Sequence, residues 1–292
     1  MSVTLSVKHR TVFTYSEPAR ENVNEVRVCP LANSTQHPEF FVLKVVPATR
    51  LRKYNDLFAN PVHQFEINSP HRKLVIESRA IVTVGNRVDY EAMPYGVTTS
   101  ELPALLENHE CCEFLGESTY VRVSPEIWRE AIDVKGDVDD VFQTTYDLMQ
   151  SVYERCEYLP GVTTAETHAD EVFQAKRGVC QDFAHLLIAY CRSLQIPARY
   201  VSGYLWDPGH NHLLRGVQAS HAWVEIYLPG HGWIGLDPTN NKVVNEQYVA
   251  VATGRDYDDV APVRGTFYGG GHHRGMEVVV EVKPAREEAV AS

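Results

Sequence analysis

A cysteine stands where a helix is expected to begin, within residues 178–185, which read GVCQDFAH. From Cys180 onward, apolar side chains recur at three- and four-residue steps, the period of one helix face. They are Phe183, Leu186, Leu187, Tyr190 and Leu194. Gly178 before the helix frees the turn, and Pro197 bounds its far end. A thiol at a helix N-terminus faces unpaired backbone amides and the positive end of the helix dipole, so the segment predicts a nucleophilic cysteine.

A nucleophilic thiol needs a base and a group that orients the base, and the downstream sequence supplies both. The sequence around His221 alternates with the two-residue period of a strand, and a turn-rich run then leads into a second strand that ends at Asp237. If Tyr227 pairs with either His231 or Trp233 in an antiparallel hairpin, Asp237 falls directly or diagonally opposite His221. Either register places the carboxylate within reach of the imidazole.

Each of these residues has a simpler explanation when it is taken alone. Cys180 is one of six cysteines, and a free cysteine often packs as a small apolar side chain. His221 fits a structural histidine, and Asp237 before Pro238 fits a turn cap. The combination, in the chain order Cys, His, Asp, favours a catalytic arrangement.

These runs, together with the strand-like residues 196–204, resemble the transglutaminase-like superfamily, specifically its bacterial two-domain cysteine protease branch. The resemblance extends to residues 255–265 and to the glycine-rich residues 269–272. It implies a papain-like core in which cysteine, histidine and aspartate form the catalytic triad. These roles map to Cys180, His221 and Asp237 in this sequence.

The expected fold class is α+β, with a papain-like or transglutaminase-like catalytic core preceded by an antiparallel β-sandwich-like domain. Short alternating runs up to about residue 84 predict the β domain, and Ser124 followed by a proline predicts the first helix of the core. The expected divisions are an N-terminal β domain (1–90), a connector (91–123), the catalytic domain (124–284) and a tail (285–292). Residues 276–282 alternate and are expected to form a last strand of the catalytic domain.

Composition and charge exclude several classes of function. Lys and Arg total 27 against 38 Asp and Glu, a net charge of −11 without a basic patch, so nucleic acid is not an expected partner. An export signal and a membrane-spanning run are both missing, which predicts a cytoplasmic protein without a membrane partner. The six cysteines lack the spacing of a disulfide scaffold and are expected to be reduced.

Four further residues are candidates for substrate binding: Asp182, Tyr204, Trp206 and Trp223. Asp182 either binds substrate or complements the positive end of the helix, and the second role is favoured. The three aromatic residues either line an acyl-binding cleft or pack in the core, where strand aromatics are more common. His210, His212, His272 and His273 match no zinc motif, so the sequence predicts neither a metal nor another cofactor.

The predicted function is thiol-dependent amide-bond chemistry on a peptide or protein substrate, through a cysteine thioester. A peptidase or amidase would resolve the thioester with water, whereas a transglutaminase would resolve it with an amine. The triad does not encode this choice, although the resemblance favours hydrolysis. A catalytically silent binding module is the third alternative, but a silent relative would be expected to lack a triad member. The sequence leaves the oligomeric state undefined.

Overall fold

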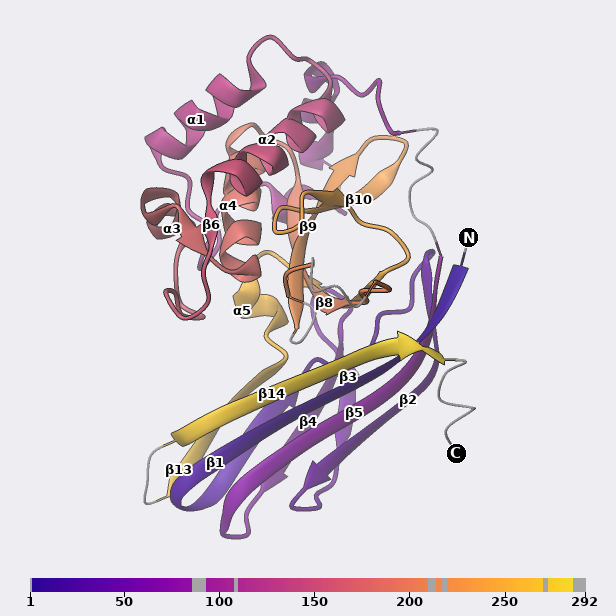
Figure 1. The fold of residues 1–292 in the computed structure, drawn as a ribbon, viewed down its shortest axis with the longest axis vertical. Helices are drawn as coiled ribbons and strands as arrows, with labels where there is room; N and C mark the ends of the chain where they lie inside the picture. The colour runs from indigo at the N-terminus through magenta and orange to yellow at the C-terminus, as the bar shows by residue number, and fades with distance from the viewer. Residues whose placement is uncertain are drawn as a thin grey trace.

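The computed structural model describes residues 2–85, 93–107, 110–209, 214–216, 220–269 and 273–285 (Figure 1). The strands are β1 Ser2–Val26, β2 Gln36–Val46, β3 Arg52–Asn55, β4 Pro61–Ile67, β5 His71–Gly85, β6 Glu157–Tyr158, β7 Arg177–Gly178, β8 Ala198–Leu205, β9 His221–Leu228, β10 Gly232–Asp237, β11 Lys242–Val243, β12 Tyr248–Gly254, β13 Val263–Gly269 and β14 His273–Pro284. The α-helices are α1 Pro125–Lys135, α2 Val141–Arg155, α3 Ala169–Ala175, α4 Cys180–Ser193 and α5 Tyr257–Val260, and the 3-10 helices are η1 Thr99–Glu107 and η2 Cys112–Phe114.

A curled antiparallel sheet forms the N-terminal part of the molecule (Figure 1). Its strand order is β2-β5-β1-β4-β3, and the 25-residue strand β1 lies at its centre. Because β1 is longer than its neighbours, its first half pairs with β5 and its second half with β4. Leu5 and Val7 are buried on one face, which confirms the strand predicted from their alternation.

The C-terminal strands β13 and β14 return to this same sheet and pair antiparallel with β1 (Figure 1). Val278, Val280 and Val282 pack there against residues of β1 and β5. Residues 276–282 are predicted as a last strand of the catalytic domain (124–284), whereas the pairing of β13 and β14 places residues 263–284 in the N-terminal sheet. Alternation predicts a strand but not its partner, and β1 offers a long side that needs backbone hydrogen bonds.

A second antiparallel sheet, of order β11-β10-β9-β8-β12, forms the core of the other part with the helices packed beside it. Helix α4 packs against β9, and Leu187, Ile188, Val224 and Ile226 belong to one buried apolar cluster between them. Ser124 caps α1 by accepting the backbone N–H of Ile127, as its sequence predicted. The expected α+β class is confirmed.

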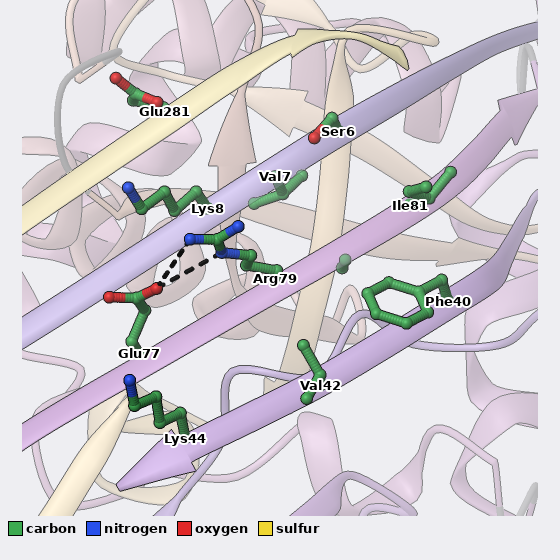
Figure 2. A pocket seen from close by; sticks show the side chains of 11 residues that line it. Ser6, Val7, Lys8, Phe40, Val42, Lys44, Glu77, Arg79, Ile81 and Glu281 are labelled. Atoms are coloured by element: carbon green, nitrogen blue, oxygen red, sulfur yellow. Dashed lines mark hydrogen bonds and ion pairs between the residues drawn. The ribbon is translucent and has the colours of Figure 1, made fainter. Parts of the chain in front are cut away.

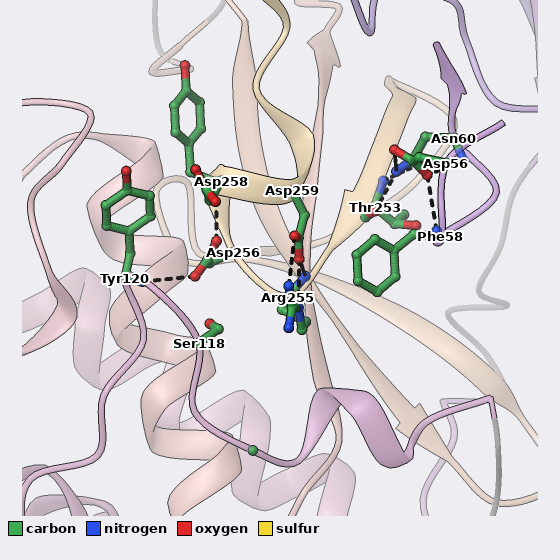
Figure 3. Close-up of polar contacts among 12 residues, drawn as sticks. Asp56, Phe58, Asn60, Ser118, Tyr120, Thr253, Arg255, Asp256, Asp258 and Asp259 are labelled. Atoms are coloured by element: carbon green, nitrogen blue, oxygen red, sulfur yellow. Dashed lines mark hydrogen bonds and ion pairs between the residues drawn. The ribbon is translucent and has the colours of Figure 1, made fainter. Parts of the chain in front are cut away.

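The two sheets pack against each other and give the arrangement its sandwich-like character. Strands β8 and β12 supply Tyr204 and Val251 to an apolar cluster that also contains Leu5 and Val82 of the N-terminal sheet. Hydrogen bonds add to this contact between the sheets (Figure 3). The Asn60 side chain accepts the backbone N–H of Thr253 and donates to its carbonyl oxygen. The relative position of the two parts is therefore fixed by apolar packing and by backbone hydrogen bonds.

The connector is also tied to the core rather than free. Figure 3 shows the Tyr120 N–H donating to the Asp256 carboxylate at 2.8 Å. The fully buried guanidinium of Arg192 on α4 donates to the carbonyl oxygens of Gly116 and Arg255. These bonds hold the chain before α1 against the far end of α4.

The outer face of the N-terminal sheet carries a shallow concavity of about 560 Å³ (Figure 2). Lys8, Lys44 and Arg79 line it beside Glu77, which accepts a hydrogen bond from Arg79. None of the candidate catalytic residues contributes to it. It is a feature of the sheet and not of the predicted site.

All six cysteines are free. Within the described ranges, no helix combines the length and the apolar character needed to cross a membrane.

Candidate active site

Cys180 is the first residue of α4, as predicted, and its side chain is half-buried. The chain reaches it through β7, whose Gly178 pairs in parallel with Tyr158 of β6. A Cβ at Gly178 would lie 2.6 Å from the carboxylate oxygen Oδ2 of Asp182, so glycine is required for space. The sequence analysis expected it to free the turn instead, but its φ lies outside the left-handed region.

Asp182 lies under the start of the helix and is fully buried. Its Oδ2 accepts the backbone N–H of Val179 and the hydroxyl of Thr163, each at 2.7 Å. Burial raises the pKa of this carboxyl group, and the two hydrogen bonds oppose the rise. These contacts support the favoured role, in which Asp182 complements the helix N-terminus and fixes the backbone that carries Cys180.

Strands β9 and β10 form the predicted hairpin, and Tyr227 pairs with Trp233. This is one of the two predicted registers, and it puts Asp237 diagonally opposite His221. The His221 Nε2 and Asp237 Oδ2 atoms lie 2.8 Å apart, and both side chains are fully buried. The hairpin thus brings the predicted base and its orienting carboxylate into direct contact.

Several donors hold the Asp237 carboxylate in place. Its Oδ1 accepts the backbone N–H of Thr239 at 2.9 Å, so the residue also caps the turn after β10. Its Oδ2 accepts the Asn240 amide at 2.7 Å and the Tyr248 hydroxyl at 2.9 Å. Burial tends to raise the pKa of this group, but His221 and these hydrogen bonds lower it overall. The carboxylate is therefore stabilised in its charged form.

His221 is held as a cation. Burial by itself would lower its pKa, but the Asp237 carboxylate, followed by Cys180, raises it to about 10. Nε2 is bonded to Asp237, whereas Nδ1 is buried without a hydrogen-bond partner among the described residues, and Cys180 lies within electrostatic reach of the ring. The three predicted residues are thus together in the order thiol, imidazole and carboxylate, which suits proton transfer between Cys180 and His221.

Of the other predicted substrate residues, Tyr204 and Trp206 pack between the two sheets, whereas Trp223 lies beside His221. Tyr204 is buried between the two sheets, where its hydroxyl is 2.8 Å from Nδ1 of His9, and Trp206 packs against the same cluster. Trp223 is fully buried on the same face of β9 as His221, with the two ring centroids 6.2 Å apart, and it packs beside Val201 and Tyr248. The packing interpretation therefore fits the buried side chains of Tyr204 and Trp223.

The candidate histidines for a metal site cannot be placed together. His210, His212 and His272 lie outside the described residues, and His273 begins β14 with its side chain undescribed. Across the parts that the structure describes, no group of three or more His, Cys, Asp or Glu side chains has a metal-binding arrangement.

Sequence reasoning missed two residues that hold the site, Asn240 and Tyr248. Asn240 had a usable signal, because an Asn three residues after Asp237 in an Asp-Pro-Thr-Asn turn bonds back to that turn. Tyr248 had none, because it begins β12, and pairing of β12 with β8 is what carries its hydroxyl to the carboxylate.

Two families of known proteins have models that match this sequence. Residues 131–238 match the model of the transglutaminase-like superfamily, and residues 5–83 match that of the bacterial transglutaminase-like N-terminal region. An uncharacterized protein of Mycobacterium leprae is 32% identical over 279 residues, which cover 95% of this chain and 98% of the relative.

Two further proteins are similar to this chain. A Cytophaga hutchinsonii structure, called that of a putative cysteine protease, superposes with a TM-score of 0.73 at 24% identity and covers 97% of this chain and 93% of its own. A protein-glutamine gamma-glutamyltransferase of Pseudomonas aeruginosa is 37% identical over 83 residues, which are 27% of this chain and 12% of that protein. The first similarity extends over both sheets, and the second is local.

Proposed function

Because this chain belongs to the transglutaminase-like superfamily, we propose that it is a thiol-dependent enzyme that cleaves amide bonds of peptide-like substrates through a cysteine thioester. One observation carries the proposal: a buried His221–Asp237 pair at 2.8 Å lies within electrostatic reach of Cys180 at the start of α4. A binding module would have no need to bury a charged pair beside a thiol, since burying charge is costly.

In the proposed mechanism, Cys180 and His221 form a thiolate and imidazolium pair that Asp237 orients. The Cys180 sulfur attacks the substrate carbonyl, a C–S bond forms, and the C–N bond breaks as His221 gives its proton to the leaving amine. Water then adds to the thioester carbonyl as His221 takes a proton from it, and the C–S bond breaks, which releases the acid and restores the thiolate and imidazolium pair.

The start of α4 also supplies a candidate oxyanion donor. The backbone N–H of Cys180 is the first of the helix and is left without an intrahelical partner. An amide aimed at the developing oxyanion contributes about 3 kcal/mol of transition-state stabilisation in enzymes of this chemical type. The dipole of the 14-residue helix acts in the same direction.

Amine transfer is the second candidate, and the local similarity to a protein-glutamine gamma-glutamyltransferase favours it. The two reactions share the thioester and differ in the group that resolves it. A location in the cytoplasm belongs to the proposal as well, and the six free thiols support it.

The test is mass spectrometry of glutamine-containing peptides incubated with the protein, with and without a primary amine. Cleavage or deamidation supports hydrolysis, whereas an added amine mass supports transfer. Cys180→Ala is expected to lower turnover by at least about 1,000-fold and to keep the fold, because one side chain carries the chemistry. Cys112→Ala is the matched control, since Cys112 is another partly exposed thiol. Full turnover in the Cys180 variant would refute the proposal.

A further inference from the structure

Arg215 is a cation beside the candidate site that forms no ion pair with a carboxylate among the described residues. Its guanidinium carbon lies 5.5 Å from the ring centroid of Tyr153 and 5.4 Å from that of Tyr158. A ring accepts no conventional hydrogen bond from the guanidinium, so these contacts leave its five N–H donors to other acceptors. Tyr153 is 38% exposed, so this pair of rings reaches solvent.

The backbone of Arg215 is fixed to the catalytic carboxylate through one side chain. Its N–H donates to Oδ1 of Asn240 at 2.9 Å, and the Asn240 amide contacts its carbonyl oxygen at 3.3 Å. The same amide nitrogen donates to Oδ2 of Asp237 at 2.7 Å. Asn240 therefore holds Arg215 at a set position relative to Asp237.

The next residue packs directly on the imidazole. Gly216 has a φ of +85°, and a Cβ there would lie 2.4 Å from Nδ1 of His221. This is the ring nitrogen that is not bonded to Asp237, so the backbone after Arg215 borders the reacting groups. Only glycine fits at this position, because it adopts a positive φ without strain and has no Cβ that would collide with the imidazole.

Tyr158 links Arg215 to the nucleophile. Burial, and to a lesser extent Cys180, raise the pKa of Tyr158 to about 12 against the opposing effect of Arg215, so its ring lies within electrostatic reach of both. The nearby carboxylates of Asp182 and Asp237 are fully buried and already hydrogen-bonded. The guanidinium therefore shares Tyr158 as a neighbour with Cys180 and has its charge available for a ligand.

We propose that Arg215 is a specificity residue that binds a carboxylate of the substrate near the scissile amide. The carboxylate belongs either to an acidic side chain or to a free carboxyl terminus, which present the same chemistry to the guanidinium. A planar guanidinium pairs with a carboxylate through two parallel hydrogen bonds. A neutral amide group at the same place, as in Gln or an amidated carboxyl terminus, cannot reproduce this pairing. The inference rests on the proposed function, since it assigns a substrate class to the same site.

The experiment compares peptides that are identical except for Glu, Gln or Lys at each position flanking the scissile bond, each with a free or an amidated carboxyl terminus. The expected result is a kcat/KM about tenfold higher for Glu than for Gln at one position, or for the free over the amidated terminus, mainly through KM. The position of the effect distinguishes the two sources of the carboxylate.

Variants of Arg215 test the assignment. Arg215→Gln is expected to reduce that tenfold preference to about one, Arg215→Glu to shift it toward Lys, and Arg215→Lys to restore part of it. The matched control is Arg129→Gln, because Arg129 also lies over a ring, that of Trp128 on α1, at 5.7 Å. A preference that is missing in the wild type or unchanged in Arg215→Gln would overturn the proposal and leave only a structural contact with the tyrosines.

A second measurement does not depend on turnover. Cys180 is alkylated with iodoacetate and with iodoacetamide, which differ in one negative charge, and the ratio of the two rates is compared between proteins. Arg215→Gln is expected to lower this ratio about threefold or more, since the anion loses an attractive cation. An unchanged ratio counts against the carboxylate site. If the wild type cleaves no peptide, the proposed function fails while this ratio still decides the role of Arg215.

Discussion

Two buried histidines, one in the candidate active site and one between the sheets, hold opposite charge states. His9 contacts the hydroxyls of Tyr204 and Thr11, each at 2.8 Å, and burial lowers its pKa to about 4. His221 is equally buried but bonds the Asp237 carboxylate, and its pKa is about 10. Burial alone neutralises an imidazole, and a carboxylate is needed to keep it charged. The active site is built to hold a cation, whereas the interface excludes one.

The two histidines couple stability to pH in opposite directions. The pKa of folded His221 lies above the ordinary value of 6.5, so its contribution is full below pH 6.5 and is lost as the pH rises through 10. The pKa of folded His9 lies below 6.5, so its contribution is full above pH 6.5 and is lost as the pH falls through 4. Each substitution below changes one side of this contrast.

The largest effect is expected from Asp237→Asn, which removes the charge and keeps the shape. Burial should then dominate at His221 as it does at His9, and the pKa of His221 should fall below 6.5. We expect kcat/KM to fall by at least about 100-fold, because the imidazolium is no longer held beside the thiol. NMR titration of the His221 ring and steady-state kinetics measure the two changes.

The control for this variant is Asp259→Asn. It removes another carboxylate, which pairs with Arg255 at 2.9 Å on the turn after β12 (Figure 3) and has no contact with His221. If Asp237→Asn kept a His221 pKa near 10, the cationic state would need another cause, and the contrast with His9 would be lost.

The candidate site follows from local sequence patterns, whereas the pairing of distant strands does not. Local periodicity is enough for α4 and for the β9–β10 hairpin, and Tyr227 opposite Trp233 then fixes where Asp237 meets His221. The pairing of β14 with β1 is not predictable in this way, because the two strands lie at opposite ends of the chain.

The surroundings of the aromatic candidates are not predictable for a similar reason. Tyr204 and Trp223 carry no local signal that tells a cleft from a core, since each lies on a strand with both faces covered. Only the packing of the second sheet against the first places Tyr204 beside His9. Partners set by long-range packing are thus outside what periodicity encodes.

The second prediction concerns His9→Gln, which keeps a hydrogen-bonding group but removes the titration. The wild type is expected to lose about 3 kcal/mol of unfolding free energy through His9 between pH 6.5 and 4, and the variant should lack this part of the decline. Chemical denaturation at several pH values measures it. His37→Gln, at an exposed position of β2, is the matched control. An identical acid slope in His9→Gln and wild type would show that His9 does not carry the effect.

The smallest effect is expected from Tyr248→Phe, which removes one hydroxyl bonded to Asp237 at 2.9 Å. The carboxylate keeps its bonds to His221 and to Asn240, so the loss should be about 1 kcal/mol, or less than about tenfold in kcat/KM. The pKa of Asp237 should rise slightly, because this hydrogen bond helps to lower it, and stability should begin to fall at a higher pH during acidification.

Tyr190→Phe is the control for this last change. It also removes a tyrosine hydroxyl bonded to a carboxylate, that of Glu130 at 2.6 Å, on the helical side of the molecule. The comparison decides whether Tyr248 acts through Asp237 or only through packing. If Tyr248→Phe lowered kcat/KM as much as Asp237→Asn, the His221–Asp237 contact alone would not be sufficient to hold the imidazolium. If Tyr248→Phe changed neither kcat/KM nor the pH at which stability begins to fall during acidification, the hydroxyl would be one of several donors that the buried carboxylate can lose.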